Sequence, residues 1–172
     1  MDIFAHTLWS AASAKVVKDR TQKIKSIGLA AFFGVAPDFF AFGPFIILWF
    51  LRNGLTAPWP QEPPGDHIIP QYVHELYHIS HSLVIFAAVF ALVWLIRRKP
   101  YWELSAWALH ILIDIPTHTS LFFPTPFLWP LSSFQVSGIK WSTPWFMILN
   151  YSALILVLYY LWVKKKSFRV EK

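Results

Sequence analysis

Within the stretch Ala106 to Ser120 (AWALHILIDIPTHTS), His110 and Asp114 interrupt an apolar run that ends at Pro116. His110 and Asp114 are four residues apart, so on a helix their side chains lie on one face, one turn apart. A neutral imidazole and a carboxylate in this arrangement suit a divalent metal ion such as zinc or manganese. The alternative is a hydrogen-bonded His–Asp pair inside a helical bundle. His118 follows just past the expected end of this helix.

Further His and Asp residues in similar apolar surroundings extend this candidate set. His6 lies in an apolar N-terminal segment, and Asp38 follows Pro37 in the middle of another. Asp38 either binds metal or caps the second half of an interrupted helix, and the two roles are compatible because a carboxylate has two oxygens. The chain has no Cys, which excludes thiolate ligands. The predicted metal ligands are His6, Asp38, His78, His81, His110 and Asp114.

The most His-rich part of the chain is the beginning of residues 74–96. His74, His78 and His81 have helical i,i+4 and i,i+3 spacing, so a continuous helix would place them along one face. Glu75 is beside them, and either Glu75 or His78 could serve as a general base. The sequence leaves open which of His74 and His78 joins the site. The alternative is that these imidazoles simply lie at the membrane–water interface.

The composition indicates that membrane helices must position these residues. Hydrophobic residues make up 56% of the 172-residue chain and charged residues only 14%, against roughly 25% in soluble domains. The chain is also rich in Trp, Phe and Tyr, which are common at membrane interfaces. We therefore expect an all-α polytopic membrane bundle that forms a single domain over residues 1–172. The four expected spans are residues 27–51, with interruptions at Pro37 and Pro44, 74–96, 102–115 and 144–163.

A short helix is expected before the first span, over residues 2–14. At about 20 Å it is too short to cross a bilayer core of about 30 Å. A signal peptide would have a positively charged start, whereas this segment carries Asp2 and no Lys or Arg. We therefore expect the N-terminus to be retained.

The basic residues predict an orientation for the bundle. All but two of the 15 Lys and Arg residues lie in three clusters, residues 15–25, 97–99 and 164–172. The positive-inside rule places these clusters in the cytoplasm. The loop 52–73, in which His67 is expected to be solvated, and the connector 117–143 then lie outside. We predict a multi-pass protein of the inner or plasma membrane and no nucleic-acid partner.

Several short motifs resemble those of a known family, the predicted membrane-bound, metal-dependent hydrolases of bacteria and archaea. That family includes a LexA-regulated inner-membrane protein, and its motif pattern is similar to that of zinc-dependent phospholipase C. Where family members often carry a His-Arg pair, this chain has Leu76-Tyr77. The motifs that carry the resemblance are Met1-Asp2 with His6-Thr7, Ala36-Pro37-Asp38, Ser80-His81-Ser82-Leu83, His110-x-Leu112-x-Asp114 with Thr117, and Trp129-Pro130.

The ligand set and the resemblance together predict a membrane-embedded metal-dependent hydrolase. One or two divalent ions, zinc or manganese, would activate water toward a phosphoester or ester. A site inside the membrane favours a lipid-like substrate that arrives laterally. Two alternatives stay open, namely a small proton or metal-ion transporter and a non-catalytic membrane interaction protein with structural His–Asp pairs.

Overall fold

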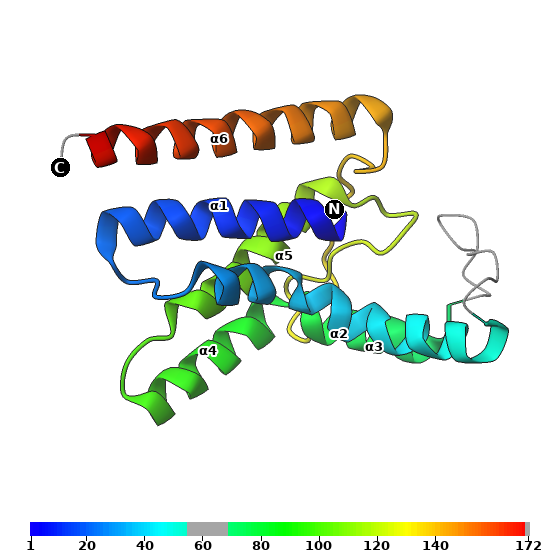
Figure 1. Ribbon diagram of the computed structural model, residues 1–172. Coiled ribbons are helices and arrows are strands. Elements are labelled where there is room, and N and C mark those ends of the chain that lie inside the picture. The colour runs from blue at the N-terminus through cyan, green and yellow to red at the C-terminus, as the bar shows by residue number, and fades with distance from the viewer. Residues whose placement is uncertain (55–68, 171–172) are drawn as a thin grey trace.

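The predicted all-α class is confirmed by the computed structural model, which describes residues 1–54 and 69–170 (Figure 1). Most of the loop predicted over residues 52–73, including His67, lies outside these described residues. The helices are α1 (Ile3–Thr21), α2 (Ile27–Asn53), α3 (Gln71–Ser80), α4 (Leu83–Arg97), the 3-10 helix η1 (Trp102–Leu104), α5 (Ser105–Thr117) and α6 (Pro144–Val170).

The N-terminal helix is longer than predicted. Asp2 caps α1 by accepting hydrogen bonds from the backbone N–H groups of Phe4 and Ala5. The helix then continues past Ala14 to Thr21, because the Lys and Arg residues of the basic segment are good helix formers. Its 19 residues give a length of about 28 Å.

The predicted interruption of the first span is wrong, because α2 runs without a break from Ile27 to Asn53 through Pro37 and Pro44. A proline removes one backbone donor, and long apolar helices tolerate this loss when neighbouring groups satisfy the freed carbonyl. Asp38 therefore lies inside a helix, and the alternative in which it caps a second half-helix is also wrong.

The predicted span 74–96 is instead a broken helix, with α3 and α4 meeting at an angle of 57°. The break begins at His81, which ends α3, and Ser82 caps α4 by accepting from the N–H groups of Val84 and Ile85. The connector stabilises the break from outside. The carbonyl of Trp129 accepts a hydrogen bond from the Ser82 hydroxyl, and that of Phe127 accepts one from the Leu83 N–H.

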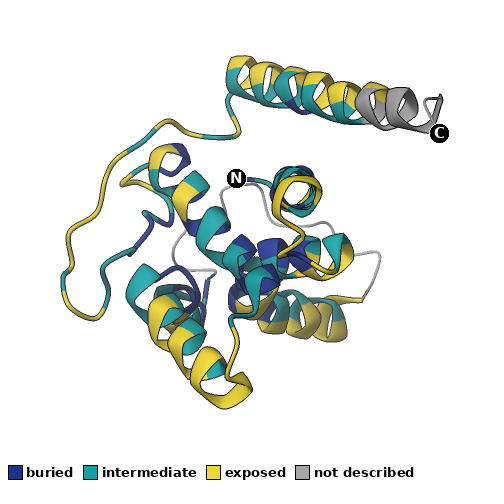
Figure 2. Cartoon of the chain, turned by 90° about the vertical axis from the view of Figure 1, so that its left-hand side faces the viewer, coloured by how far each residue is buried: buried dark blue, intermediate teal, exposed yellow. Residues whose placement is uncertain are grey.

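Two helices, α2 and α6, are long and apolar enough to cross a membrane, and α3 with α4 would make a third if the broken pair counts as one span. The predicted third span, residues 102–115, corresponds to η1 and α5, and α5 alone has 13 residues and a length of about 20 Å, less than the bilayer core of about 30 Å. Exposed side chains line much of α4 and α6 (Figure 2).

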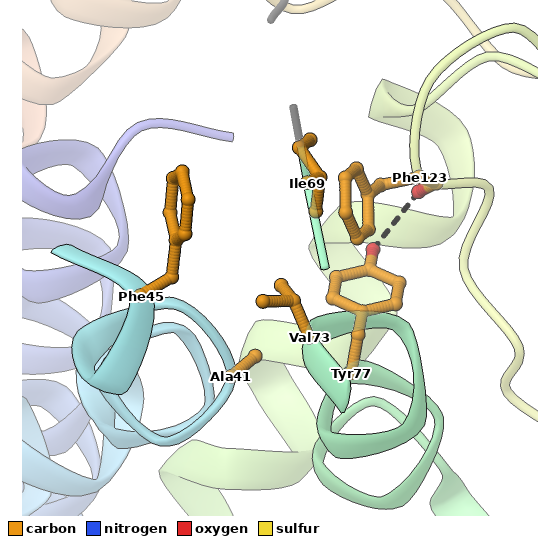
Figure 3. Packing of buried hydrophobic residues seen from close by; sticks show 6 residues of the cluster. All are labelled: Ala41, Phe45, Ile69, Val73, Tyr77 and Phe123. Carbon is orange, nitrogen blue, oxygen red and sulfur yellow. Dashed lines mark hydrogen bonds between the residues drawn. The ribbon is translucent and has the colours of Figure 1, made fainter. Parts of the chain in front are cut away.

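The buried residues gather where α1, α2, α3 and α5 meet. One apolar cluster joins Ala41 and Phe45 of α2 to Val73 and Tyr77 of α3, with Phe123 of the connector against them (Figure 3). The ends of α4 and α6 and the α1–α2 loop lie at one side of the molecule (Figure 1). These ends carry the three basic clusters. The connector lies toward the opposite side (Figure 1).

Candidate metal centre

Asp38 of α2, His81 at the α3–α4 break, and His110 and Asp114 of α5 form a group that could hold a metal ion. One ligand atom from each side chain lies within 4.8 Å of all the others. His81, His110 and Asp114 are buried, and the Asp38 side chain is 13% exposed. Residues separated by up to 76 positions in the sequence therefore converge on one point between three helical segments.

The His110 ring is oriented by a backbone contact. Its Nδ1 lies 2.8 Å from the carbonyl oxygen of Gly34 in α2, and because a carbonyl can only accept, Nδ1 carries the proton. The Nε2 lone pair therefore faces the group, where it lies 3.1 Å from Asp114 Oδ2. A metal-binding His is typically held in this way, with its second nitrogen donating to a carbonyl or carboxylate.

The His81 ring is held by its neighbours. Its Nδ1 lies 2.9 Å from the Ser80 hydroxyl, which is itself 3.4 Å from the Tyr77 carbonyl oxygen. Its Nε2 faces the group and lies 3.0 Å from Nε2 of His110. When both nitrogens are unprotonated, their lone pairs repel each other at this distance, and a cation between them relieves the repulsion.

The spacing of the ligand atoms fits a tetrahedral ion. Donors 2.0–2.1 Å from a tetrahedral zinc ion lie about 3.3 Å from one another. His81 Nε2 lies 3.5 Å from both Asp38 Oδ1 and Asp114 Oδ2, and His110 Nε2 lies 3.7 Å from Asp38 Oδ1. Asp114 Oδ2 is buried and accepts no hydrogen bond from the described residues. The four side chains therefore fit a divalent ion.

The second oxygen of Asp114 faces a different set of groups. Asp114 Oδ1 lies 3.0 Å from His6 Nε2 and 3.4 Å from His118 Nε2. The α-amino group of Met1 contacts both Asp114 Oδ1, at 2.5 Å, and His118 Nε2, at 3.0 Å. The Oδ1 side thus already holds a positively charged group, and Asp114 bridges two cation-attracting positions.

Three predicted site residues, Glu75, His78 and His6, lie outside the four-residue group, although His6 contacts Asp114 Oδ1. Glu75 is exposed on α3, and His78 is half-buried and has its ring near that of Trp129. Of the three imidazoles predicted on one face, only that of His81 belongs to the four-residue group. His74 stacks on Phe123 and also lies outside the group.

His118 is the residue near the centre that the predicted ligand set lacked. Its Nδ1 lies 2.9 Å from the Phe123 carbonyl, which leaves Nε2 free to face Asp114. The sequence carried a signal for it, because His110, Asp114 and His118 recur every four residues. The contacts of Gly34 and Ser80 with the imidazoles have no comparable sequence signal.

No family model, curated protein or solved structure matches the chain.

Proposed function

We propose that this protein is a membrane-embedded, metal-dependent hydrolase of phosphoesters or esters in lipid-like substrates. The observation that carries the proposal is the group of two carboxylates and two imidazoles whose Nε2 atoms face one another. Asp38 and Asp114 supply two negative charges toward a divalent ion, in addition to the ion pair of Asp114 with the Met1 α-ammonium group. The resemblance to predicted membrane metal-dependent hydrolases supports the same function.

A second ion on the Oδ1 side of Asp114 would displace the Met1 α-ammonium group or replace its proton. His6 and His118 offer imidazole nitrogens there, and Asp114 would bridge the two positions. Imidazole and carboxylate ligands suit zinc, with manganese as the alternative. Two ions of this kind would polarise a phosphoryl or carbonyl oxygen and lower the pKa of a bound water molecule.

The surrounding residues orient this centre and shield it. Gly34 and Ser80 fix the two imidazoles, and the Tyr77 ring covers His81 at a centroid distance of 3.7 Å. The helices around the centre expose apolar side chains on their outer surfaces. A lipid-like substrate would approach such a centre from within the membrane.

Metal analysis of the detergent-purified protein tests this function. We expect one to two zinc or manganese ions per wild-type chain, a large loss in Asp114→Ala, and hydrolysis of bis(p-nitrophenyl) phosphate or a phospholipid that follows the metal content. Asp19→Asn is a matched control, because Asp19 is exposed on α1 and far from the centre. Wild-type protein that lacks metal after chelator-free purification would instead favour a proton relay or a structural role.

A further inference from the structure

A hollow lies beside the metal centre, on the side of the molecule where the connector lies. It has a volume of about 260 Å³. This is below the roughly 300–1,000 Å³ of pockets for drug-sized ligands, and so fits a headgroup better than a whole lipid. The polar side chains that line it are His74, His78, Ser120 and Gln135.

The chemistry of this lining favours an anion. Two imidazoles, a hydroxyl and an amide can all donate hydrogen bonds, and no carboxylate of the described residues lines the hollow. Neither the His74 imidazole nor the His78 imidazole makes a hydrogen bond with another described residue, so both rings have donors to offer. The His74 ring is held in place, stacked on Phe123 at 4.7 Å with an angle of 3° between the planes.

The rim and the inner wall of the hollow are apolar. Leu121 and Pro124 line the hollow, and Leu121 is 90% exposed. An acyl chain could lie against such side chains while the polar headgroup occupies the hollow. Free phosphate would gain nothing from them.

The inner wall is shared with the metal centre. Tyr77 and Phe123 line the hollow, and the Tyr77 ring also stacks on the ring of His81. The Phe123 carbonyl accepts hydrogen bonds from the Tyr77 hydroxyl at 3.0 Å and from His118 Nδ1 at 2.9 Å (Figure 3 shows the first). One aromatic layer therefore separates the hollow from the centre.

We propose that this hollow binds the phosphate-bearing headgroup of a lipid, with His74 and His78 as its donors, and delivers that lipid to the metal centre. The class of substrate is then an amphiphile with an anionic phosphate, which rests on the proposed hydrolase function. The binding step itself requires no metal and can be measured separately.

Binding can be measured by native mass spectrometry or thermophoresis on detergent-purified, full-length protein. The probes are dihexanoyl phosphatidic acid, the matched diacylglycerol without phosphate, and inorganic phosphate. We expect phosphatidic acid to bind more tightly than either of the other two. A His74→Gln/His78→Gln variant should bind it about tenfold more weakly, the loss expected for one or two charge-assisted hydrogen bonds.

Gln71→Ala, exposed on the same helix, is the control and should bind like wild type. The thermal unfolding temperature and metal content of the double variant should also equal those of wild type, which separates lost binding from lost folding. Equal affinity for diacylglycerol, equal affinity for free phosphate, or unchanged binding by the double variant would each overturn the inference. Lipid binding by wild-type protein that holds no metal would instead uphold the binding step and overturn both the delivery step and the hydrolase function.

Discussion

The four ligand residues present an electrostatic problem that a metal ion solves. Burying an ionised carboxylate is costly unless an opposite charge or hydrogen bonds compensate it. Asp38 and Asp114 approach the same pair of imidazoles, whose Nε2 atoms face one another. The Met1 α-ammonium group compensates part of this charge through Asp114 Oδ1, and a divalent ion would supply the rest, so the stability of this cluster should depend on metal.

The first prediction concerns Asp38, the most solvent-accessible member of the group. Asp38→Asn keeps the size of the side chain and removes its charge, so we expect metal affinity to fall by more than about tenfold. Secondary structure and assembly in detergent should be retained. Competition with a chelating dye would measure the affinity, with Asp19→Asn as control. If Asp38→Asn binds metal as tightly as wild type, Asp38 is not a ligand of the site.

The second prediction separates one ion from two. His118 contacts only the Oδ1 side of Asp114, so His118→Ala should lower the metal content from two ions per chain to one. His74→Ala, an imidazole deletion outside the group, should leave the content unchanged. Elemental analysis with protein quantification decides the matter. If His118→Ala holds as many ions as wild type, there is no second ion at this position.

At the scale of the elements, the close approach of α1 and α2 brings His6 to the centre. A Cβ atom at Gly34 of α2 would overlap the Ser10 side chain of α1, so only glycine fits there. The Gly34 carbonyl also accepts the hydrogen bond that orients His110. One small residue thus couples helix packing to ligand geometry.

This coupling leads to the third prediction. Gly34→Ala should lower the free energy of unfolding by about 1–3 kcal/mol, the usual cost of overpacking, and weaken metal binding. Gly43→Ala is the matched control in the same helix, since a Cβ atom there meets nothing within 4 Å. Ser10→Gly should restore part of the loss in the double variant. Thermal unfolding would measure each effect, and equal losses in both alanine variants would contradict the packing argument.

Glu103 joins the α1–α2 loop to the start of α5. It lies in η1, outside α2, α6 and the α3–α4 pair, and accepts hydrogen bonds from the backbone N–H groups of Lys25, at 2.7 Å, and Ser26, at 3.0 Å. Burial alone would raise the pKa of the Glu103 carboxyl. The backbone donors, including its own N–H, outweigh burial and lower this pKa below the usual 4.5.

The fourth prediction follows from the sign of this shift. Because the pKa of Glu103 is lower in the folded state, its stabilising contribution is present above pH 4.5 and is lost as the pH falls through the folded-state value. At pH 7, Glu103→Gln should be less stable than wild type by roughly 1 kcal/mol. The difference in unfolding temperature should shrink below pH 4.5. A difference that is constant with pH would show that charge plays no part.

At the scale of the whole molecule, the arrangement of the helix ends agrees with the charge-based topology. Lys23 lies over the ring of Trp102, and Arg97 lies over the ring of Tyr101, so two of the basic clusters come together. The C-terminal end of α6 lies at the same side (Figure 1). This grouping supports the proposal that these ends face the cytoplasm.

The fifth prediction tests that orientation with single cysteines, which is straightforward because the chain has none of its own. In intact cells, an impermeant maleimide should label Ser133→Cys in the connector and not Lys99→Cys at the end of α4. Both positions are exposed, so permeabilised cells should label both. The reverse pattern in intact cells would invert the topology.

Local sequence properties determined the helical class and the core of the site. Apolar runs of helical length predict helices whatever surrounds them, and the spacing of His110 and Asp114 fixes their shared face through the helical repeat. Asp38 and His81 stood out because few ionisable residues occur in such apolar surroundings. These inferences needed no knowledge of how the helices pack.

Tertiary contacts alone decided the rest. The connector carbonyls of Phe127 and Trp129 stabilise the break after His81, where the apolar run predicted a continuous helix. Packing also keeps α2 continuous through Pro37. His118 reaches Asp114 because its ring is held by Phe123, outside any helix. Each outcome depends on partners distant in sequence, whose positions helical periodicity cannot encode.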